Sequence, residues 1–218
     1  MDLLEMDPSE IENMFESKKE QIFKSDIETK TITAENYDYS LTLRVEDIVD
    51  KKDQYKFIKS CEHMIRSSPE YKLWVQYIRE VMGIQECEIT GEIHDQTKSE
   101  IHHHPFSLFI IVKAVLNKHM ASNKKFCSFD IALEAIQLHY EMRVPFISLL
   151  KSIHEKFTNG YLKIPMEFVH GDHTYFLNNY AEYLDEEDLN PIYERLKVTK
   201  ENCGWKEGYK WIVPTNGE

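Results

Sequence analysis

The spacing of apolar residues along the chain predicts a mainly helical protein. From Gln54 to Ile65 apolar positions recur every three or four residues, which is the period of an amphipathic helix. Ser68-Pro69 then ends this helix and begins another that runs to Gly83, because Ser is a good N-cap and Pro fits the first turn. Further helices are predicted over 106–120, from Ser128 through His139 and over 146–157, with two more capped by Asp172 and Asp185.

Two short segments in the middle of the chain interrupt the helical pattern. Residues 86–91 are β-prone and end at a glycine, and a polar loop then leads into residues 100–104, which stop at Pro105. We interpret them as the two strands of a β-hairpin. The predicted fold class is therefore α+β and mainly helical, with a small hairpin–helix unit embedded in a helical domain.

The charge divides the chain into unequal parts. The whole chain carries a net charge of -12, yet residues 1–50 alone hold 14 acidic and 5 basic residues, whereas residues 101–150 are slightly basic. We predict an acidic N-terminal segment over 1–50, which is either a hairpin-bearing arm that binds a partner or a solvated flank. A mainly helical domain over 51–200 and an aromatic C-terminal tail over 201–218 complete the predicted organisation.

Composition excludes several classes of protein. With 42% hydrophobic residues and only 7 Gly and 7 Pro, the chain is neither wholly disordered nor collagen-like. No apolar run approaches the length of about 18 residues that a membrane span needs, and the acidic amino terminus is unlike a secretory signal. The four cysteines form no CxxC pair, so we expect free thiols and a cytoplasmic protein without a membrane partner.

Histidine is concentrated in the predicted hairpin and the helices after it. Nine of the ten histidines lie between His94 and His173, and three are consecutive at 102–104. Alternation along a strand puts Glu100, His102 and His104 on one face and His103 on the other. Imidazole binds divalent transition metals, and a second imidazole that is not a ligand can take a proton from water. The triplet therefore indicates a metal-dependent site, although exposed turn histidines explain it as well.

Two motifs resemble HNH nucleases, whose fold is the ββα-metal unit. Residues 87–106, which read CEITGEIHDQTKSEIHHHPF, resemble the opening hairpin of that family, and residues 144–160, VPFISLLKSIHEKFTNG, resemble its closing helix. The chain looks most like divergent bacteriophage members that carry a helical insertion between these two parts. The resemblance implies an HNH-like unit over 85–160 and, for a phage protein, a location in the host cytoplasm.

The resemblance also implies roles for four residues. His102 and His154 would be metal ligands, His103 the general base, and Asn117 the residue that orients the base. The cofactor would be a divalent metal such as Mg²⁺, Mn²⁺, Ni²⁺ or Zn²⁺, and the substrate a phosphodiester in nucleic acid.

The departures from the HNH pattern favour a second function. Thr158 replaces the second histidine of the closing H-x3-H pair, only Cys87 remains of the cysteines that brace many relatives, and the surrounding charge is weakly basic. The sequence therefore leaves two hypotheses: a phage-type HNH-like nuclease, or a catalytically inactive protein on the same scaffold. The inactive protein would bind a basic host or phage protein through its acidic surface.

Overall fold

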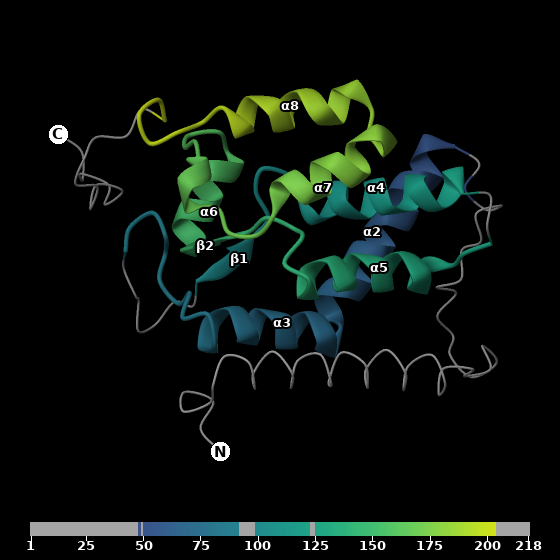
Figure 1. Cartoon of the computed structure of the whole chain (residues 1–218), viewed down its shortest axis with the longest axis horizontal. Coiled ribbons are helices and arrows are strands. Elements are labelled where there is room, and N and C mark those ends of the chain that lie inside the picture. Colours follow the sequence, from purple (N-terminus) through teal and green to yellow (C-terminus); the bar gives the residue numbers. More distant parts are fainter. Residues whose placement is uncertain (1–47, 49, 92–98, 123–124, 204–218) are drawn as a thin grey trace, which may run out of the picture. The chain divides into compact units, whose positions relative to one another are not determined.

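The computed structural model describes residues 48, 50–91, 99–122 and 125–203, all of which fall in one compact unit (Figure 1). The predicted acidic segment with its hairpin lies almost wholly outside these residues, as does most of the C-terminal tail, so the proposed domain boundaries stay predictions. The helices are α2 (Lys51–Ser67), α3 (Pro69–Glu80), α4 (Leu108–Ala121), α5 (Ser128–Tyr140), α6 (Lys151–Thr158), α7 (His173–Tyr180) and α8 (Glu186–Leu196). Two short 3₁₀ turns, η4 (Met166–Phe168) and η5 (Ala181–Tyr183), precede α7 and α8, respectively.

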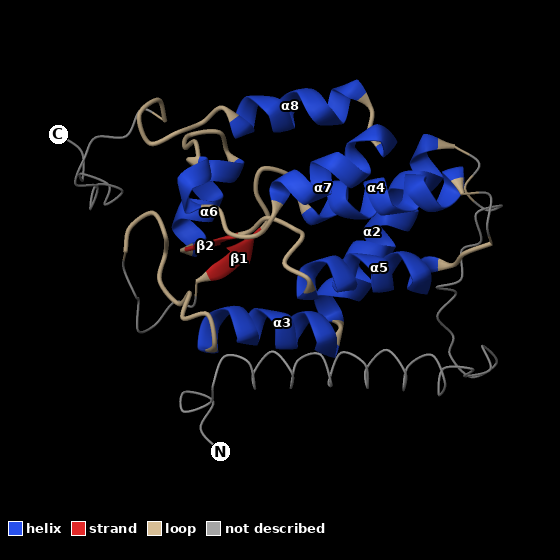
Figure 2. Cartoon of the chain, viewed as in Figure 1, coloured by secondary structure: helices blue, strands red, loops and turns tan. Residues whose placement is uncertain are grey.

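The prediction of a mainly helical α+β protein is confirmed. Seven α-helices and one small two-stranded sheet make up the regular structure of the described residues, and Figure 2 shows the two short strands among the helices. None of the helices in these ranges is long and apolar enough to cross a membrane.

Helix boundaries follow the capping residues closely. Ser68 ends α2 and caps α3 by accepting a hydrogen bond from the Tyr71 N–H, with Pro69 in the first turn, as the sequence predicts. Asp172 and Asp185 are the N-caps of α7 and α8, which confirms that prediction too. The start of α5 differs from the prediction by one residue, because Cys127 is the N-cap and Ser128 is the first helical residue.

The predicted hairpin is wrong in its first strand, residues 86–91. Strand β1 (Glu100–His102) pairs antiparallel with β2 (Ile147–Leu149), which comes from the segment expected to open the helix over 146–157. Residues 87–91 form a turn instead, in which the N–H groups of Thr90 and Gly91 donate to the Cys87 carbonyl. The helix therefore begins only at Lys151. The order β1, β2 and α6 joins a distant strand, β1, to two elements that follow each other directly.

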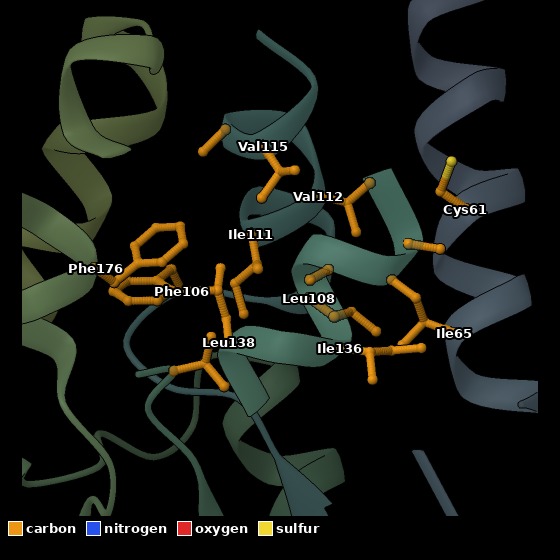
Figure 3. Packing of buried hydrophobic residues seen from close by; sticks show 14 of the residues in the cluster. Cys61, Ile65, Phe106, Leu108, Ile111, Val112, Val115, Ile136, Leu138 and Phe176 are labelled. Atoms are coloured by element: carbon orange, nitrogen blue, oxygen red, sulfur yellow. The ribbon is translucent and has the colours of Figure 1, made fainter. Parts of the chain in front are cut away.

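Two separate clusters of buried side chains form the interior. The larger, which we call the main core, lies between α2, α3, α4, α5, α7 and α8 and includes Trp74, Phe106 and Phe176. Figure 3 shows part of it, with Ile111 and Val112 of α4 among the packed side chains. The smaller cluster, which we call the small core, gathers the apolar residues of β2, α6 and their flanks, including Ile147 and Ile153.

Glycine is required at residue 171, where the chain enters α7. Gly171 has a φ of +82°, and a Cβ there would lie 2.2 Å from the Val144 carbonyl oxygen. This close approach accompanies an isolated antiparallel bridge between Phe146 and His170, whose N–H groups each donate to the other's carbonyl. The bridge fixes the chain directly before β2 and so helps to place the second strand.

Candidate functional site: two groups of histidines on one strand

Strand β1 and the two residues after it carry three histidines with opposite surroundings. His102 is half-buried, whereas His103 is 4% exposed and His104 is 1% exposed. Since side chains alternate along a strand, His102 and His103 point to different sides of the chain. Their partners differ accordingly: His102 contacts α6 and His103 contacts α3 and α5.

The first group consists of Glu100, His102 and His154, and we call it the outer cluster. The His102 and His154 rings have centroids 4.4 Å apart, and Nδ1 of His154 lies 2.8 Å from Oε2 of Glu100. The Phe157 ring, one turn along α6, lies 5.1 Å from the His102 ring and limits its movement. The structure therefore brings together the two residues that the HNH resemblance names as metal ligands.

The outer cluster favours an uncharged His102. Burial, together with the repulsion that a charged His154 would exert, lowers the pKa of His102 to about 3. A neutral imidazole keeps one lone pair, which is the form that binds a metal ion. The Glu100–His154 pair remains accessible, since their side chains are 44% and 32% exposed, respectively.

His104 lies beside the outer cluster without joining it. Its ring centroid is 6.5 Å from that of His102 and 5.1 Å from that of Phe157. Among the described residues, neither of its ring nitrogens has a hydrogen-bond partner although both are buried, and burial lowers its pKa to about 3.

The second group is the pair His103 and His139, which we call the inner pair. Their Nε2 atoms lie 2.8 Å apart, and Nδ1 of His139 lies 2.6 Å from the Ala135 carbonyl oxygen. A carbonyl only accepts, so His139 Nδ1 donates to it, and in the neutral pair His139 Nε2 accepts from His103 Nε2–H. The hydrogen bonds thus define the tautomer of each ring.

The inner pair is enclosed by aromatic rings. Trp74 stacks on His103 at 6.1 Å and meets His139 edge-on at 4.8 Å. Burial lowers the pKa of both histidines, that of His139 to about 4. His139 is thus a buried histidine with both ring nitrogens hydrogen-bonded, whereas its partner His103 was expected, as general base, to face a substrate.

Asn117, predicted to orient the general base, lies in a different polar network. Its Oδ1 accepts a hydrogen bond from Gln54 Nε2 at 2.8 Å, and its Nδ2 donates to the Tyr183 carbonyl at 2.7 Å. It thereby joins α2, α4 and η5, and the structure does not bring it to either histidine group. The residue bonded to His103 is instead His139, for which the sequence offers no pairing signal.

The number and type of donor atoms in the outer cluster decide whether it can bind a metal ion. Within the described ranges, no group of three or more His, Cys, Asp or Glu side chains is arranged to hold a metal ion. Two imidazoles do converge there, and a carboxylate is bonded to one of them, which is how many metal-binding histidines are oriented. The metal-ligand roles of His102 and His154 therefore stay a prediction.

A polar hollow of about 400 Å³ lies apart from the histidines of β1, between α4, α5 and α7. At its centre, Glu134 accepts hydrogen bonds from Lys118 at 2.8 Å and from Tyr180 at 2.7 Å, and it also meets His119. These donors lower the pKa of Glu134 despite the opposing effect of burial. The Glu134 carboxylate therefore already has hydrogen-bond partners within the protein.

Fold and site together define a mainly helical α+β protein with a histidine-lined two-stranded sheet. The family model of the bacteriophage G278-like virion proteins matches residues 6–210, so the chain belongs to this family, which supports a bacteriophage origin. Comparisons with curated proteins and with solved structures give no match. The relationship with HNH nucleases is not shown by these comparisons.

Proposed function

We propose that this protein is a component of the phage particle that works by binding a partner and not by catalysis. The observation that carries the proposal is the position of His103, which the HNH resemblance assigns as general base. Its ring is 4% exposed and its Nε2 is bonded to His139. A general base has to reach the proton it removes, directly or through one water, and this ring faces the main core.

The partner that suits the chain best is a basic phage or host protein. The net charge of -12 disfavours nucleic acid, whose phosphates are contacted mainly by Lys and Arg. Within the described residues, the first turn of α8 presents exposed Glu186 and Glu187. Complementary charge of this kind raises the rate and the specificity of association. Assembly into particles would take place in the host cytoplasm.

The test is the protein content of purified particles. Virions are banded in a density gradient, and peptides of this chain are quantified by mass spectrometry against a capsid protein and a phage enzyme known to stay in the lysate. We expect a fixed number of copies per particle that survives a second gradient. Depletion of the chain in parallel with the lysate enzyme would contradict the proposal.

The partner is tested separately with immobilised protein. Full-length chain and a variant that lacks residues 1–50 are compared as bait against disrupted particles, at low and at high salt. Binding that weakens with salt and with the deletion supports an acidic docking segment. Binding insensitive to both would place the partner on another surface.

A second candidate function is metal-dependent hydrolysis of a phosphodiester, and it is favoured by the outer cluster. His102 from β1 and His154 from α6 stand side by side in a β1–β2–α6 order, which agrees with the ββα-metal arrangement. A bound divalent metal would neutralise the scissile phosphate there. In this candidate His102 and His154 are the ligands. The base and orienting roles that the resemblance implies for His103 and Asn117 would require both side chains to leave their present hydrogen-bond partners.

Nicking of supercoiled plasmid tests this candidate. Wild type, His102→Ala and His103→Ala are each assayed with Mg²⁺, Mn²⁺, Ni²⁺ and Zn²⁺. The hydrolase hypothesis requires nicking by the wild type and a rate at least 100-fold lower in both variants, which is the size of effect expected when an essential acid–base group is lost. No nicking with any metal, or equal nicking by all three proteins, would exclude it.

A further inference from the structure

We propose that the polar hollow between α4, α5 and α7 receives an arginine side chain of the partner protein. The inference rests on the binding function proposed above and deepens it, because it names the surface that the basic partner contacts. It uses neither of the histidine groups at β1 and needs no metal ion.

The hollow offers space for one side chain from outside. Its volume of about 400 Å³ falls at the lower end of the range of about 300–1,000 Å³ that is usual for ligand pockets. One wall is a face of α5 whose polar residues follow one another at intervals of three or four: Asp130, Glu134, Gln137 and Glu141. Residues at this spacing lie on one side of a helix. Asp130 and Gln137 are exposed, so the hollow is open to solvent along this wall.

The hollow already holds one cation of the chain itself. Nζ of Lys118 lies 2.8 Å from Glu134 Oε1, 3.3 Å from the Tyr180 hydroxyl oxygen and 4.6 Å from the centroid of the Tyr180 ring. A carboxylate and the face of an aromatic ring both attract a cation. The second tyrosine of the lining, Tyr175, has the Arg143 guanidinium 4.3 Å from its ring centroid. These contacts indicate that the walls of the hollow are suited to positive charge.

The lining carries an excess of negative charge. It contains three carboxylates, those of Asp130, Glu134 and Glu141, against one ammonium group, that of Lys118. With His119 neutral, two negative charges are in excess, and one is in excess if His119 is protonated. Such a lining repels the phosphates of nucleic acid and attracts a cation. A basic side chain of a protein is therefore the occupant that fits.

Arginine suits the hollow better than lysine. Its planar guanidinium has five N–H donors, stacks on aromatic rings and is more weakly hydrated than an ammonium group. Asp130 is the exposed acceptor that a guanidinium entering from solvent can reach. Its Oδ2 accepts a hydrogen bond from the Cys127 N–H at 2.7 Å, whereas an ionised carboxylate offers about four acceptor sites. Arginine can therefore bond to Asp130 while the cap of α5 stays in place.

Lys118 competes with the incoming arginine. Its side chain is 39% exposed and stands in the last turn of α4, and its ammonium group repels a guanidinium in the same hollow. Lys118→Gln removes this charge and keeps a hydrogen-bond donor, so it should strengthen the binding of arginine. Loss of an exposed lysine elsewhere should have little effect, because salt screens charges separated by more than about 8 Å at physiological ionic strength.

The experiment uses the full chain and a tripeptide, Gly-Arg-Gly with both ends capped, as the probe. Counterparts with lysine and with citrulline, the uncharged analogue of arginine, are titrated beside it. Two-dimensional ¹H–¹⁵N NMR at physiological salt gives the dissociation constant and the amides that respond. We expect the arginine peptide to shift amide signals of α4, α5 and α7 around the hollow. The lysine peptide should bind more weakly, and the citrulline peptide should not bind.

Three variants assign the site. Asp130→Asn keeps an oxygen that can cap α5, and Glu141→Gln keeps an acceptor for the Gln137 amide, so each removes a charge and little else. We expect each to weaken arginine binding about 3–5-fold, on the scale of a partly exposed ion pair. Lys118→Gln should strengthen it by a similar factor.

Two controls make the same charge changes away from the hollow. Glu186→Gln lies on α8 and Lys56→Gln on α2, where the lysine side chain is 61% exposed, and neither residue lines the hollow. Both should change the dissociation constant by less than about twofold. Circular dichroism checks the fold of every variant. Lys118→Met replaces Lys118→Gln if the latter does not fold.

The proposal is overturned if the citrulline peptide binds as tightly as the arginine peptide, if loss of the Lys118 charge does not strengthen binding, or if the controls have effects as large as the three site variants. Its failure is distinguishable from failure of the binding function. A chain that is a fixed component of particles but does not bind the arginine peptide would keep the function and lose this site. A chain absent from particles would lose the function whatever the peptide does.

Discussion

His102 and His103 are neighbours in sequence, yet their surroundings are those of two different kinds of site. His102 lies against His154, which is bonded to the Glu100 carboxylate, whereas His103 is enclosed by Trp74 and hydrogen-bonded to His139. One peptide unit separates a candidate ligand from a structural residue. Consecutive side chains of a strand point to opposite faces, so identical residues that are adjacent in the sequence come to lie in different surroundings.

The largest effect is expected from Trp74, which holds the inner pair in place. Trp74→Ala should lower the free energy of unfolding by about 3–5 kcal/mol, because a fully buried indole is removed from the main core. Urea denaturation measures the loss. The control is Leu73→Ala on the same helix, where the side chain is 42% exposed and the cost should stay below about 1 kcal/mol. Equal costs for the two variants would contradict the enclosure of His103.

Mild acid should come next, because it charges histidines that the fold keeps neutral. The pKa of His139 is lowered to about 4 in the folded protein, against about 6.5 for an unfolded histidine. The stabilisation is therefore complete above pH 6.5 and is lost as the pH falls from 6.5 towards 4. The loss attributable to His139 is about 3 kcal/mol, since each pKa unit corresponds to about 1.4 kcal/mol.

Denaturant titrations at pH 7.5, 6.0 and 5.0 measure this dependence. His139→Leu removes one of the titrating groups and should make the profile less steep over that range, while His102, His103 and His104 keep a part of the dependence. If the wild-type free energy of unfolding were the same at pH 7.5 and pH 5.0, the buried neutral pair would not describe the protein in solution.

Replacing each of the two adjacent histidines compares them directly. His103→Ala removes a buried ring and leaves His139 Nε2 without its donor, so we expect a cost of about 2 kcal/mol. His102→Ala removes a half-buried ring at the edge of the small core and should cost about 1 kcal/mol without metal. Urea midpoints in chelator give both values. A larger cost for His102 would reverse the assignment of structural and ligand roles.

The smallest effect is expected at Glu100. The Glu100–His154 pair is substantially exposed, so Glu100→Gln should change the free energy of unfolding by less than about 1 kcal/mol in the absence of metal. If the metal-dependent candidate function holds, the same substitution should weaken Zn²⁺ binding, because Glu100 orients His154. Denaturation in chelator and a separate Zn²⁺ titration distinguish the two outcomes, and a large loss of stability without metal would show a structural carboxylate.

Helices were predictable because their signals are local. The apolar period of α2, the Ser68-Pro69 junction and the caps at Asp172 and Asp185 each act within a few residues, and all of them agree with the structure. Strand β2 was missed for the opposite reason. Its residues, Ile-Ser-Leu, are fully buried and lie in a short, mostly apolar stretch, which periodicity does not distinguish from part of a buried helix.

The histidine groups were predictable only in part. The motif context placed His102 with His154, and the structure brings them together. The hydrogen bond between His103, directly after β1, and His139 in α5 joins residues 36 positions apart. No local sequence pattern around either histidine predicts this pairing. The resemblance implies that Asn117 orients the base, whereas its helix directs it to Gln54 and Tyr183.

The pairing of β1 with β2 has a consequence for the order in which the chain folds. Glu100 pairs with Leu149 and His102 with Ile147, and the segment between them contains α4 and α5. Closing so long a loop costs conformational entropy. The ladder has three residue pairs, which offset only a small part of that cost. The sheet should therefore form after α4 and α5 have docked and shortened the path between its strands. On this route the outer cluster is assembled at a late step. A partly folded chain in which the sheet has not yet formed would therefore contain α4 and α5 but not the outer cluster.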